Sequence, residues 1–170
     1  MTTAVYPGSF DPFTNGHQDI LERALGIFDK VIIAVVRNPG KNPLFTLDER
    51  VEIIKNSIPA GSNIQVECFN GLLVDFMKKV DSRIIVKGLR AVSDFEFEFQ
   101  MALMNRKLNP EIETVFLMTS ADYAFLSSSK VREIAVLGGE VKCLVSPYTD
   151  EVLRKKLAGK QSGGENVEKD

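Results

Sequence analysis

Four polar clusters in the sequence have residue types suited to binding a phosphate-containing substrate. In the first, segment 6–17, Gly8 allows a ligand to approach the backbone, Ser9 offers a hydroxyl, and His17 is the only histidine of the chain. A helix that begins near His17 would add unpaired N–H groups and the positive end of its dipole. An ordinary strand–helix connection would explain a lone histidine, but not the glycine, serine and Asp-Pro pair that accompany it.

The other three clusters supply cations and hydroxyl groups. Lys41 follows one expected strand, segment 87–90 (Lys-Gly-Leu-Arg) follows another, and segment 127–132 (Ser-Ser-Ser-Lys-Val-Arg) follows a third. Lysine acts on phosphate as a point charge, arginine as a planar fork, and serines direct hydroxyl and N–H groups at an anion. The structural alternatives are a solvated lysine, a basic turn and simple helix capping. The absence of a G-x-G-x-x-G fingerprint and of a Walker G-K-[ST] loop argues against nicotinamide or flavin dehydrogenases and P-loop kinases.

Short apolar segments alternate with helical patterns, which predicts an α/β domain with a doubly wound, five-stranded parallel sheet. We expect strands at 4–6, 31–36, 64–69, 84–86 and 114–118. Helices are expected at 17–28, 47–58, 72–80, 93–108, 128–137 and 150–157, with capping boxes at Thr46 and Glu49 and at Ser93 and Glu96. Ligands of such sheets bind beyond the carboxyl ends of the strands, so the four clusters should meet at one edge.

The composition predicts one domain of residues 1–158, followed by a tail at 159–170 that we expect to be disordered. The 170 residues carry a net charge of −2, without the basic footprint of a nucleic-acid-binding protein. Cys68 and Cys143 stand in unlike contexts, which argues against a disulfide scaffold or a cysteine zinc site and favours a reducing compartment. No apolar segment approaches the ~20 residues of a membrane span, and the first residues do not resemble a signal peptide. We therefore expect a cytoplasmic protein with no membrane or nucleic-acid partner.

Segment 95–104 contains a band of aromatic and methionine residues, namely Phe95, Phe97, Phe99, Met101 and Met104. We expect most of this band in the core or in a subunit contact, with methionine as a flexible filler. Alternating phenylalanines on a helix cannot all face one way, which suggests that part of the band is buried against another chain. Capping explains Glu96, whereas it does not explain Glu98.

Two of the polar clusters resemble signatures of the nucleotidyltransferase superfamily. Segment 14–17 (Thr-Asn-Gly-His) resembles its x-x-G-H pattern, and segment 127–130 resembles its serine-rich second motif. More narrowly, segments 6–12, 87–90 and 94–98 together resemble the bacterial phosphopantetheine adenylyltransferases, and the similarity extends over about residues 3–157. This resemblance implies a Rossmann-like, dinucleotide-binding nucleotidyltransferase fold.

The resemblance implies reversible transfer of the adenylyl group from ATP to 4′-phosphopantetheine, giving dephospho-CoA and pyrophosphate in coenzyme A biosynthesis. It also implies Mg²⁺ on the phosphates, a homohexamer, and coenzyme A as feedback inhibitor. The nucleophile would be a phosphate oxygen that is already anionic at neutral pH, because the second pKa of a phosphate is about 6. No general base or covalent intermediate is then needed, and catalysis rests on alignment and charge stabilisation. We expect no metal ligands from the protein itself, because the sequence shows no carboxylate cluster.

Residue roles follow from the same resemblance. His17 would stabilise the transition state at the α-phosphate, and Lys41 and Arg90 would act with it. The ATP site would comprise Ser9, Phe10, His17, Gly88, Leu89, Arg90, Glu98, Tyr123, Ala124, Phe125, Leu126, Ser127, Ser128 and Ser129. The phosphopantetheine site would comprise Ser9, Lys41, Leu73 and Lys87.

Two positions depart from choices that are frequent in the resembled family. Ser9 stands where threonine is frequent, which keeps the hydroxyl. Lys87 stands where arginine is frequent, which keeps the charge but loses the bidentate fork. Thr14 takes the place of the first histidine of the wider H-x-G-H motif, and this replacement is usual in the resembled family.

Two other functions fit the sequence less well. Another nucleotidyltransferase would adenylylate or cytidylylate a mononucleotide or glycerol phosphate, but segment 87–90 and the phenylalanine-rich band argue against this. A non-catalytic sensor would bind ATP or coenzyme A and signal through oligomer contacts, but it need not keep His17, Lys41 and Arg90 together. Turnover with phosphopantetheine, or ATP binding without turnover, separates these hypotheses.

Overall fold

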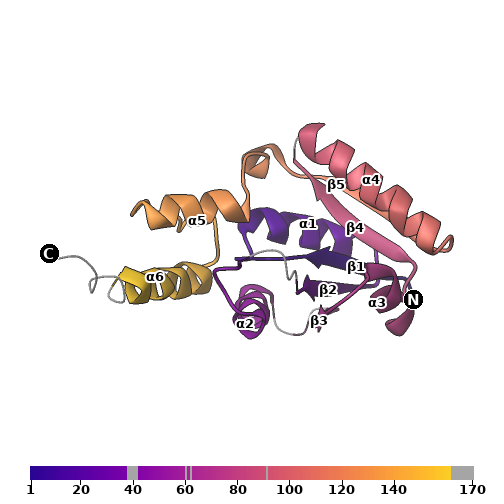
Figure 1. Cartoon of the computed structure of the whole chain (residues 1–170), viewed down its shortest axis with the longest axis horizontal. Coiled ribbons are helices and arrows are strands. Elements are labelled where there is room, and N and C mark those ends of the chain that lie inside the picture. Colours follow the sequence, from indigo (N-terminus) through magenta and orange to yellow (C-terminus); the bar gives the residue numbers. More distant parts are fainter. Residues whose placement is uncertain (38–41, 60, 62, 91, 162–170) are drawn as a thin grey trace, which may run out of the picture.

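The computed structural model describes residues 1–37, 42–59, 61, 63–90 and 92–161 of the chain. Within them lies a five-stranded sheet in the order β3-β2-β1-β4-β5, with every neighbouring pair parallel (Figure 1). The strands are β1 Thr3–Gly8, β2 Lys30–Val36, β3 Ile64–Phe69, β4 Ile84–Leu89 and β5 Glu113–Met118. The helices are α1 Asn15–Leu25, α2 Leu47–Ser57, α3 Leu73–Lys79, α4 Val92–Leu108, α5 Ser128–Val136 and α6 Pro147–Gln161, with a 3₁₀ turn η1 at Ala121–Tyr123. The predicted doubly wound α/β fold with five parallel strands is confirmed.

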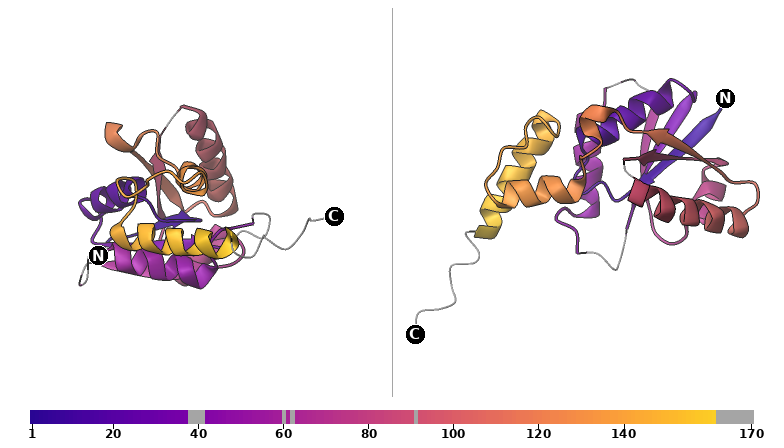
Figure 2. Two further views of the ribbon diagram at one scale, coloured as in Figure 1. Left: turned by 90° about the vertical axis from the view of Figure 1, so that its left-hand side faces the viewer. Right: turned by 90° about the horizontal axis from the view of Figure 1, so that it is seen from above.

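Apolar side chains on both faces of the sheet hold two layers of helices. Ile33 and Val86 belong to the core that α1 and α2 cover, whereas Ile32 and Ile85 belong to the core that α3 covers. Because successive side chains of a strand point to opposite faces, a strand that is apolar throughout has to be covered on both. Figure 2 shows α1 and α2 on one side of the sheet and α3 and α4 on the other.

Two strands end two or three residues later than the sequence predicted. β1 runs to Gly8 rather than to residue 6, and β4 runs to Leu89 rather than to residue 86. The parallel register explains both extensions, since it pairs Gly8 with Val35 and Gly88 with Leu117. Residues 87–89 therefore belong to β4 itself and not to a loop that follows it.

Helix boundaries differ from the prediction where an end depends on a cap. α1 begins at Asn15, because Thr14 is its N-cap, and α6 begins at Pro147, where Ser146 Oγ accepts the N–H of Thr149 at 3.2 Å. α4 begins at Val92, so Ser93 lies inside the helix rather than before it. Side chains of residues 92–94 lie outside the described ones, and so does the expected cap of α4. The capping box predicted at the start of α2 is present.

The C-terminal helices extend beyond the carboxyl edge of the sheet (Figure 1). α6 lies alongside α2, where Lys156 Nζ is 2.6 Å from Glu49 Oε1 and the Tyr148 hydroxyl donates to Glu52 Oε1 at 2.8 Å. α6 continues to Gln161, past the domain boundary predicted at residue 158, and residues 162–170 lie outside the described residues.

None of the helices in the described ranges is long and apolar enough to cross a membrane.

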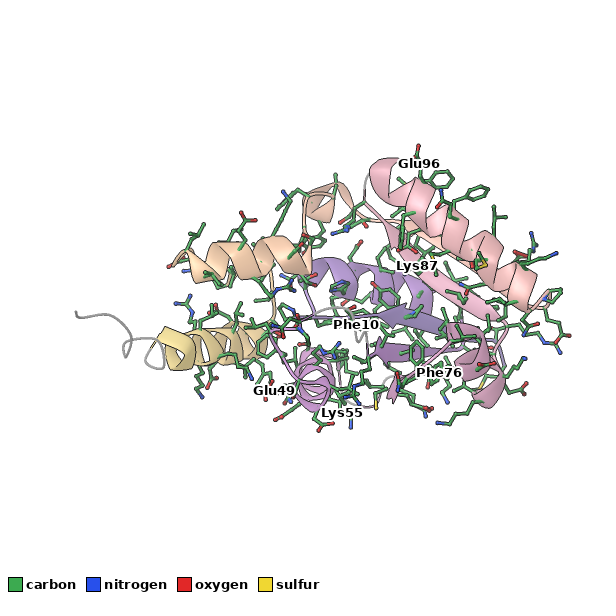
Figure 3. The ribbon with its side chains drawn as sticks, in the orientation of Figure 1. Phe10, Glu49, Lys55, Phe76, Lys87 and Glu96 are labelled. Atoms are coloured by element: carbon green, nitrogen blue, oxygen red, sulfur yellow. The ribbon has the colours of Figure 1, made fainter. Side chains whose placement is uncertain are left out.

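The aromatic and methionine band of α4 is exposed in this single chain. Phe97 is 64% exposed, and Phe95, Phe99, Met101 and Met104 are each more than 40% exposed. Of the two expected locations, the core is therefore wrong for the chain alone. In Figure 3 side chains project from the outer side of α4, around the labelled Glu96. Burial against another chain stays a prediction.

Candidate active site

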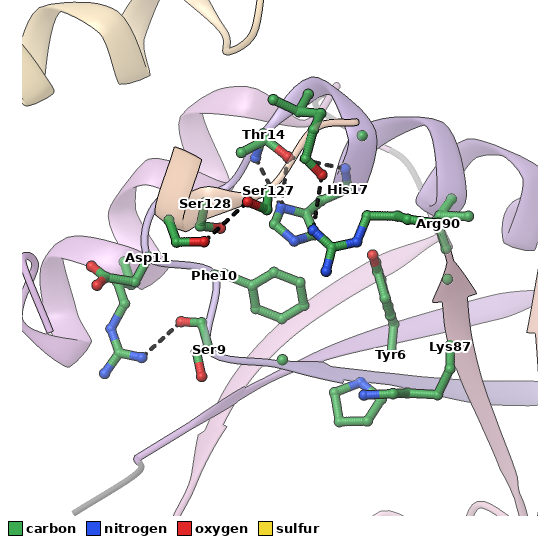
Figure 4. Close-up of a pocket in the computed structure, with 18 of the residues that line it drawn as sticks. Tyr6, Ser9, Phe10, Asp11, Thr14, His17, Lys87, Arg90, Ser127 and Ser128 are labelled. Carbon is green, nitrogen blue, oxygen red and sulfur yellow. Dashed lines mark hydrogen bonds between the residues drawn. The ribbon is translucent and has the colours of Figure 1, made fainter. Parts of the chain in front are cut away.

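A cavity of about 380 Å³ opens where β1 and β4 end and where α1 and α5 begin (Figure 4). Its walls come from three of the polar clusters, segments 6–17, 87–90 and 127–132, together with Glu98 of α4. The structure thus brings these three clusters together at the carboxyl edge of the sheet. Lys41 lies outside the described residues, although the adjacent Asn42 and Pro43 line the cavity.

His17 is held at the first turn of α1 by a reciprocal cap with Thr14. The Thr14 N–H donates to His17 Nδ1 at 3.0 Å, and the His17 N–H donates to Thr14 Oγ1 at 3.4 Å. Because Nδ1 accepts a hydrogen bond from an amide, the ring proton of neutral His17 sits on Nε2. Burial, and then the charges of Arg90 and Lys87, lower the pKa of His17 from 6.5 to about 3. At neutral pH His17 is therefore an uncharged hydrogen-bond donor.

Two phenylalanine rings fix the plane of the imidazole. Phe10 meets the His17 ring edge-on, with centroids 5.1 Å apart, and Phe13 stacks on it at 5.4 Å. Phe10 has a φ of 47°, in the left-handed region that non-glycine residues seldom adopt. A Cβ on Gly8 would lie 2.7 Å from Phe10 Cζ, so this position requires glycine. The loop after β1 is thus shaped around the histidine.

Arg50 of α2 is a buried cation at the cavity that the sequence analysis missed. Its Nη1 donates to the Ser9 carbonyl at 2.7 Å and to the Val36 carbonyl at 3.1 Å, which joins the ends of β1 and β2. Burial lowers the pKa of Arg50, although a guanidinium stays charged at any physiological pH. The available signal was an arginine at helical spacing from Ile53 and Ile54, on the core face of α2.

Asp11 connects three segments around the cavity. Its carboxylate accepts the N–H groups of Leu44 and Phe45, each at 2.9 Å, and a hydrogen bond from Arg132 Nη1 at 3.2 Å. Arg132 of α5 also donates to the Asp11 carbonyl. The sequence analysis noted Asp11 only as part of an Asp-Pro pair. These bonds show a residue that positions the walls of the cavity.

Two cations of the cavity are held by groups of different elements. Lys87 Nζ lies 3.1 Å from Glu98 Oε1, and Arg90 Nη1 donates to the Leu126 carbonyl at 3.0 Å. Ser127 Oγ accepts the N–H of Lys130 and so caps α5. Among the described residues, two helix N-termini and four cationic side chains line this cavity, which favours a ligand with several negative charges.

The remaining predicted residues divide into two groups. Those that line the cavity are Ser9, Phe10, Gly88, Leu126, Ser127, Ser128 and Ser129. Those that do not line it are Leu73, Leu89, Tyr123, Ala124 and Phe125. Leu73 begins α3, Leu89 is buried at the end of β4, and Phe125 is 61% exposed. Contacts of either group with a substrate stay predictions.

Comparisons with known proteins define the class. A family model described as "Cytidylyltransferase-like" matches residues 5–134. The structure of a putative nicotinate-nucleotide adenylyltransferase from Vibrio parahaemolyticus has a TM-score of 0.68 at 17% identity, covering 90% of this chain and 99% of that one. A nicotinic acid mononucleotide adenylyltransferase from Plasmodium falciparum has a TM-score of 0.65 at 14% identity, covering 98% and 99%. The structures show the fold alone, and with the family model they place the chain among the nucleotidyltransferases.

Sequence relatives narrow this class. A phosphopantetheine adenylyltransferase from Heliobacterium modesticaldum is 64% identical over 147 residues, which cover 86% of this chain and 88% of the relative. One from Alkaliphilus metalliredigens is 56% identical over 156 residues, covering 92% and 99%. The chain belongs to the phosphopantetheine adenylyltransferase family, and it is therefore an enzyme. The resemblance found in the sequence is confirmed.

Proposed function

We propose that the protein transfers the adenylyl group of ATP to 4′-phosphopantetheine and releases pyrophosphate, the step that forms dephospho-CoA in coenzyme A biosynthesis. The observation that carries this proposal is the cavity that neutral His17 shares with Lys87 and Arg90 beside two helix N-termini. Such a site binds and polarises phosphates without a general base or a covalent nucleophile. Membership of the family supports phosphopantetheine as the acceptor.

The transfer is a displacement at the α-phosphorus of ATP. An oxygen of the pantetheine phosphate forms a bond to this phosphorus while the bond to the bridging oxygen of pyrophosphate breaks, and the bond electrons leave with pyrophosphate. No proton has to be removed, because the attacking phosphate is already anionic. His17 Nε2–H donates to an oxygen of the α-phosphate, where charge rises in the transition state. Lys41 and Arg90 add positive charge.

We assign predicted residues in and around the cavity to the two substrates. Gly88, Arg90, Glu98 and segment 123–129 would hold ATP, and Ser9, Lys41, Leu73 and Lys87 would hold phosphopantetheine. The ion pair of Lys87 with Glu98 lies between these groups, at 3.1 Å. An incoming phosphate therefore competes with Glu98 for Lys87, which couples the acceptor site to a residue of the ATP site.

We propose that Mg²⁺ binds through phosphate oxygens and water rather than through a set of protein ligands. Of the described residues, two carboxylates line the cavity, and both have partners, Asp11 with Arg132 and Glu98 with Lys87. Over the described part of the chain, no group of three or more His, Cys, Asp or Glu side chains could hold a metal ion. Coordination by substrate and water is usual for Mg²⁺, which when bound offsets the charge of the phosphates.

We further propose a cytoplasmic homohexamer that coenzyme A inhibits. The exposed band of α4 supports an assembly, because monomeric proteins seldom expose contiguous apolar patches of this kind. Coenzyme A contains both a phosphopantetheine arm and an adenine nucleotide, so its parts match both proposed substrate sites. Light scattering should give a mass six times that of the chain, and coenzyme A should compete with both substrates.

The experiment that tests the function is pyrophosphate release from ATP and Mg²⁺, with and without phosphopantetheine. We expect release that requires phosphopantetheine and an equal amount of dephospho-CoA, identified by mass. Release that instead requires nicotinate mononucleotide or glycerol phosphate would place the protein in another branch of the nucleotidyltransferases. ATP binding without release on any acceptor would favour a nucleotide sensor.

A further inference from the structure

We propose that Asp19 and Arg23 of α1 are positioning residues for ATP, although neither side chain lines the cavity. They fix segment 119–127, of which Thr119, Leu126 and Ser127 line the cavity, relative to His17 on the same helix. This inference rests on the proposed use of ATP, and it adds two residues that no sequence motif indicated.

Side chains of α1 hold the start of this segment through its backbone. Asp19 Oδ2 accepts a hydrogen bond from the Ser120 N–H at 3.1 Å, and Arg23 Nη1 donates to the Met118 carbonyl. The two backbone groups flank Thr119, whose own N–H donates to the Leu89 carbonyl of β4 at 2.9 Å. They lie at the end of β5, an edge strand that has a neighbouring strand on one side only, so α1 supplies their partners. Asp19 Oδ2 and Arg23 Nη1 lie 3.9 Å apart, one helical turn from each other, so each orients the other.

The other end of the segment is held by a cation of the cavity itself. Arg90 Nη1 donates to the Leu126 carbonyl at 3.0 Å. Between the two ends, the Tyr123 N–H donates to the Ser120 carbonyl at 3.0 Å and the Leu126 N–H donates to the Tyr123 carbonyl at 2.9 Å. These bonds link Ser120 to Leu126 in a continuous series. Releasing Ser120 from Asp19 therefore displaces groups that line the cavity.

The contacts of Asp19 and Arg23 with the backbone of residues 118 and 120, here called the clamp, affect the orientation of segment 119–127 more than the stability of the fold. Asp19 and His17 are two residues apart on α1. The clamp therefore fixes the position of segment 119–127 relative to the helix that carries the His17 imidazole. The side chain of Arg23 is 46% exposed, and a partly exposed ion pair contributes little to folding. Misplacement of a substrate by about 1 Å, in contrast, lowers catalytic rates strongly.

The test compares Asp19→Ala with Asp19→Asn and with Asp150→Ala on α6. Asp19→Ala removes the acceptor of the Ser120 N–H, whereas Asp19→Asn keeps an oxygen that can accept it. Asp150 is a matched control, because it forms the same i,i+4 pair with Arg154 and its side chain is 18% exposed, against 17% for Asp19. Each variant is assayed for both Michaelis constants and for its melting temperature.

Asp19→Ala should raise KM for ATP about tenfold and leave KM for phosphopantetheine within about threefold of wild type. Asp19→Asn and Asp150→Ala should keep both constants within about threefold. Equal rises in both constants, or a lower melting temperature with unchanged kinetics, would overturn the proposal.

Arg23→Met gives a second route that does not depend on the folding of Asp19→Ala, since Arg23 is the more exposed partner. It should raise KM for ATP with the same selectivity, and an unchanged KM would overturn the role of Arg23. If the wild type releases no pyrophosphate with phosphopantetheine, the proposed function fails. Calorimetric titration with ATP alone then still decides the positioning role, because Asp19→Ala should bind ATP about tenfold more weakly than wild type.

Discussion

The depressed pKa of His17 predicts that the free protein loses stability in mild acid. The unfolded chain takes up a proton on His17 near pH 6.5, whereas the folded chain does so only near pH 3. A folded state that binds fewer protons than the unfolded state becomes less stable as the pH falls. The loss therefore begins below pH 6.5, grows as the solution becomes more acidic, and reaches its limit below about pH 3.

The linkage relation gives the size of this effect. Between about pH 7 and pH 5, one proton that binds only the unfolded state lowers the free energy of unfolding by up to about 2 kcal/mol. Because the His17 ring borders an open cavity, screening by water reduces the expected loss to about 1–2 kcal/mol. Urea unfolding at both pH values measures it, with His17→Asn as the control, since this side chain can still accept the Thr14 N–H but does not titrate. Other titrating groups contribute equally in both proteins. The additional loss of unfolding free energy in wild type therefore measures the contribution of His17.

An NMR titration checks the same reasoning directly. His17 is the only histidine, so its ring signals need no further assignment. We expect no titration of the folded protein between about pH 8 and pH 5, and ¹⁵N shifts of the tautomer protonated at Nε2. A titration midpoint near pH 6.5 would refute the claim that His17 is a neutral donor. An equal loss of unfolding free energy in acid for wild type and His17→Asn would refute it as well.

Three further substitutions test the packing and the charges of the site. Gly88→Ala places a Cβ 2.8 Å from Ile20 Cγ1, so thermal unfolding should show a free energy of unfolding that is lower by about 1–3 kcal/mol. An unchanged melting temperature would contradict the close approach of β4 to α1. Arg50→Met leaves two carbonyl groups without their donor and should lower the free energy of urea unfolding by about 1–3 kcal/mol. A change within about 0.5 kcal/mol, typical of a surface position, would contradict that role. Lys87→Met should raise KM for phosphopantetheine about tenfold in the pyrophosphate assay, while Lys87→Arg should stay within about threefold; no effect of Lys87→Met would remove this cation from the acceptor site.

Apolar pattern alone predicted the strands that carry no site residues. β3 was expected at 64–69 and is observed there, and β2 begins one residue before its predicted start. The ends of β1 and β4 were missed, because Gly8, Lys87 and Gly88 occupy strand positions with residue types that serve the cavity. The pattern could not tell an apolar helix face in the core from one in a subunit contact, so both were expected for the band of α4, and the structure excludes the core for the single chain.

The clusters of the site were predictable, whereas the contacts that position them were not. The carboxyl-edge rule for parallel sheets needs only the order of strands and polar segments, and it brought three clusters to one cavity. Arg50 reaches a carbonyl 41 residues away in sequence, and Asp11 accepts an N–H 33 residues away. Hydrogen bonds to backbone groups so distant leave no local pattern of residue types, so only the folded chain shows them.

The most direct test of the central claim is a single-turnover measurement of adenylyl transfer in His17→Ala, with both substrates saturating. The rate should fall about 10²–10³-fold, as expected for the loss of a donor to the transition state. The affinity for ATP, measured by calorimetry, should change by less than about threefold, because the donor acts on charge that develops during the reaction. A rate near that of wild type, or a loss explained entirely by weaker ATP binding, would contradict the assignment of His17.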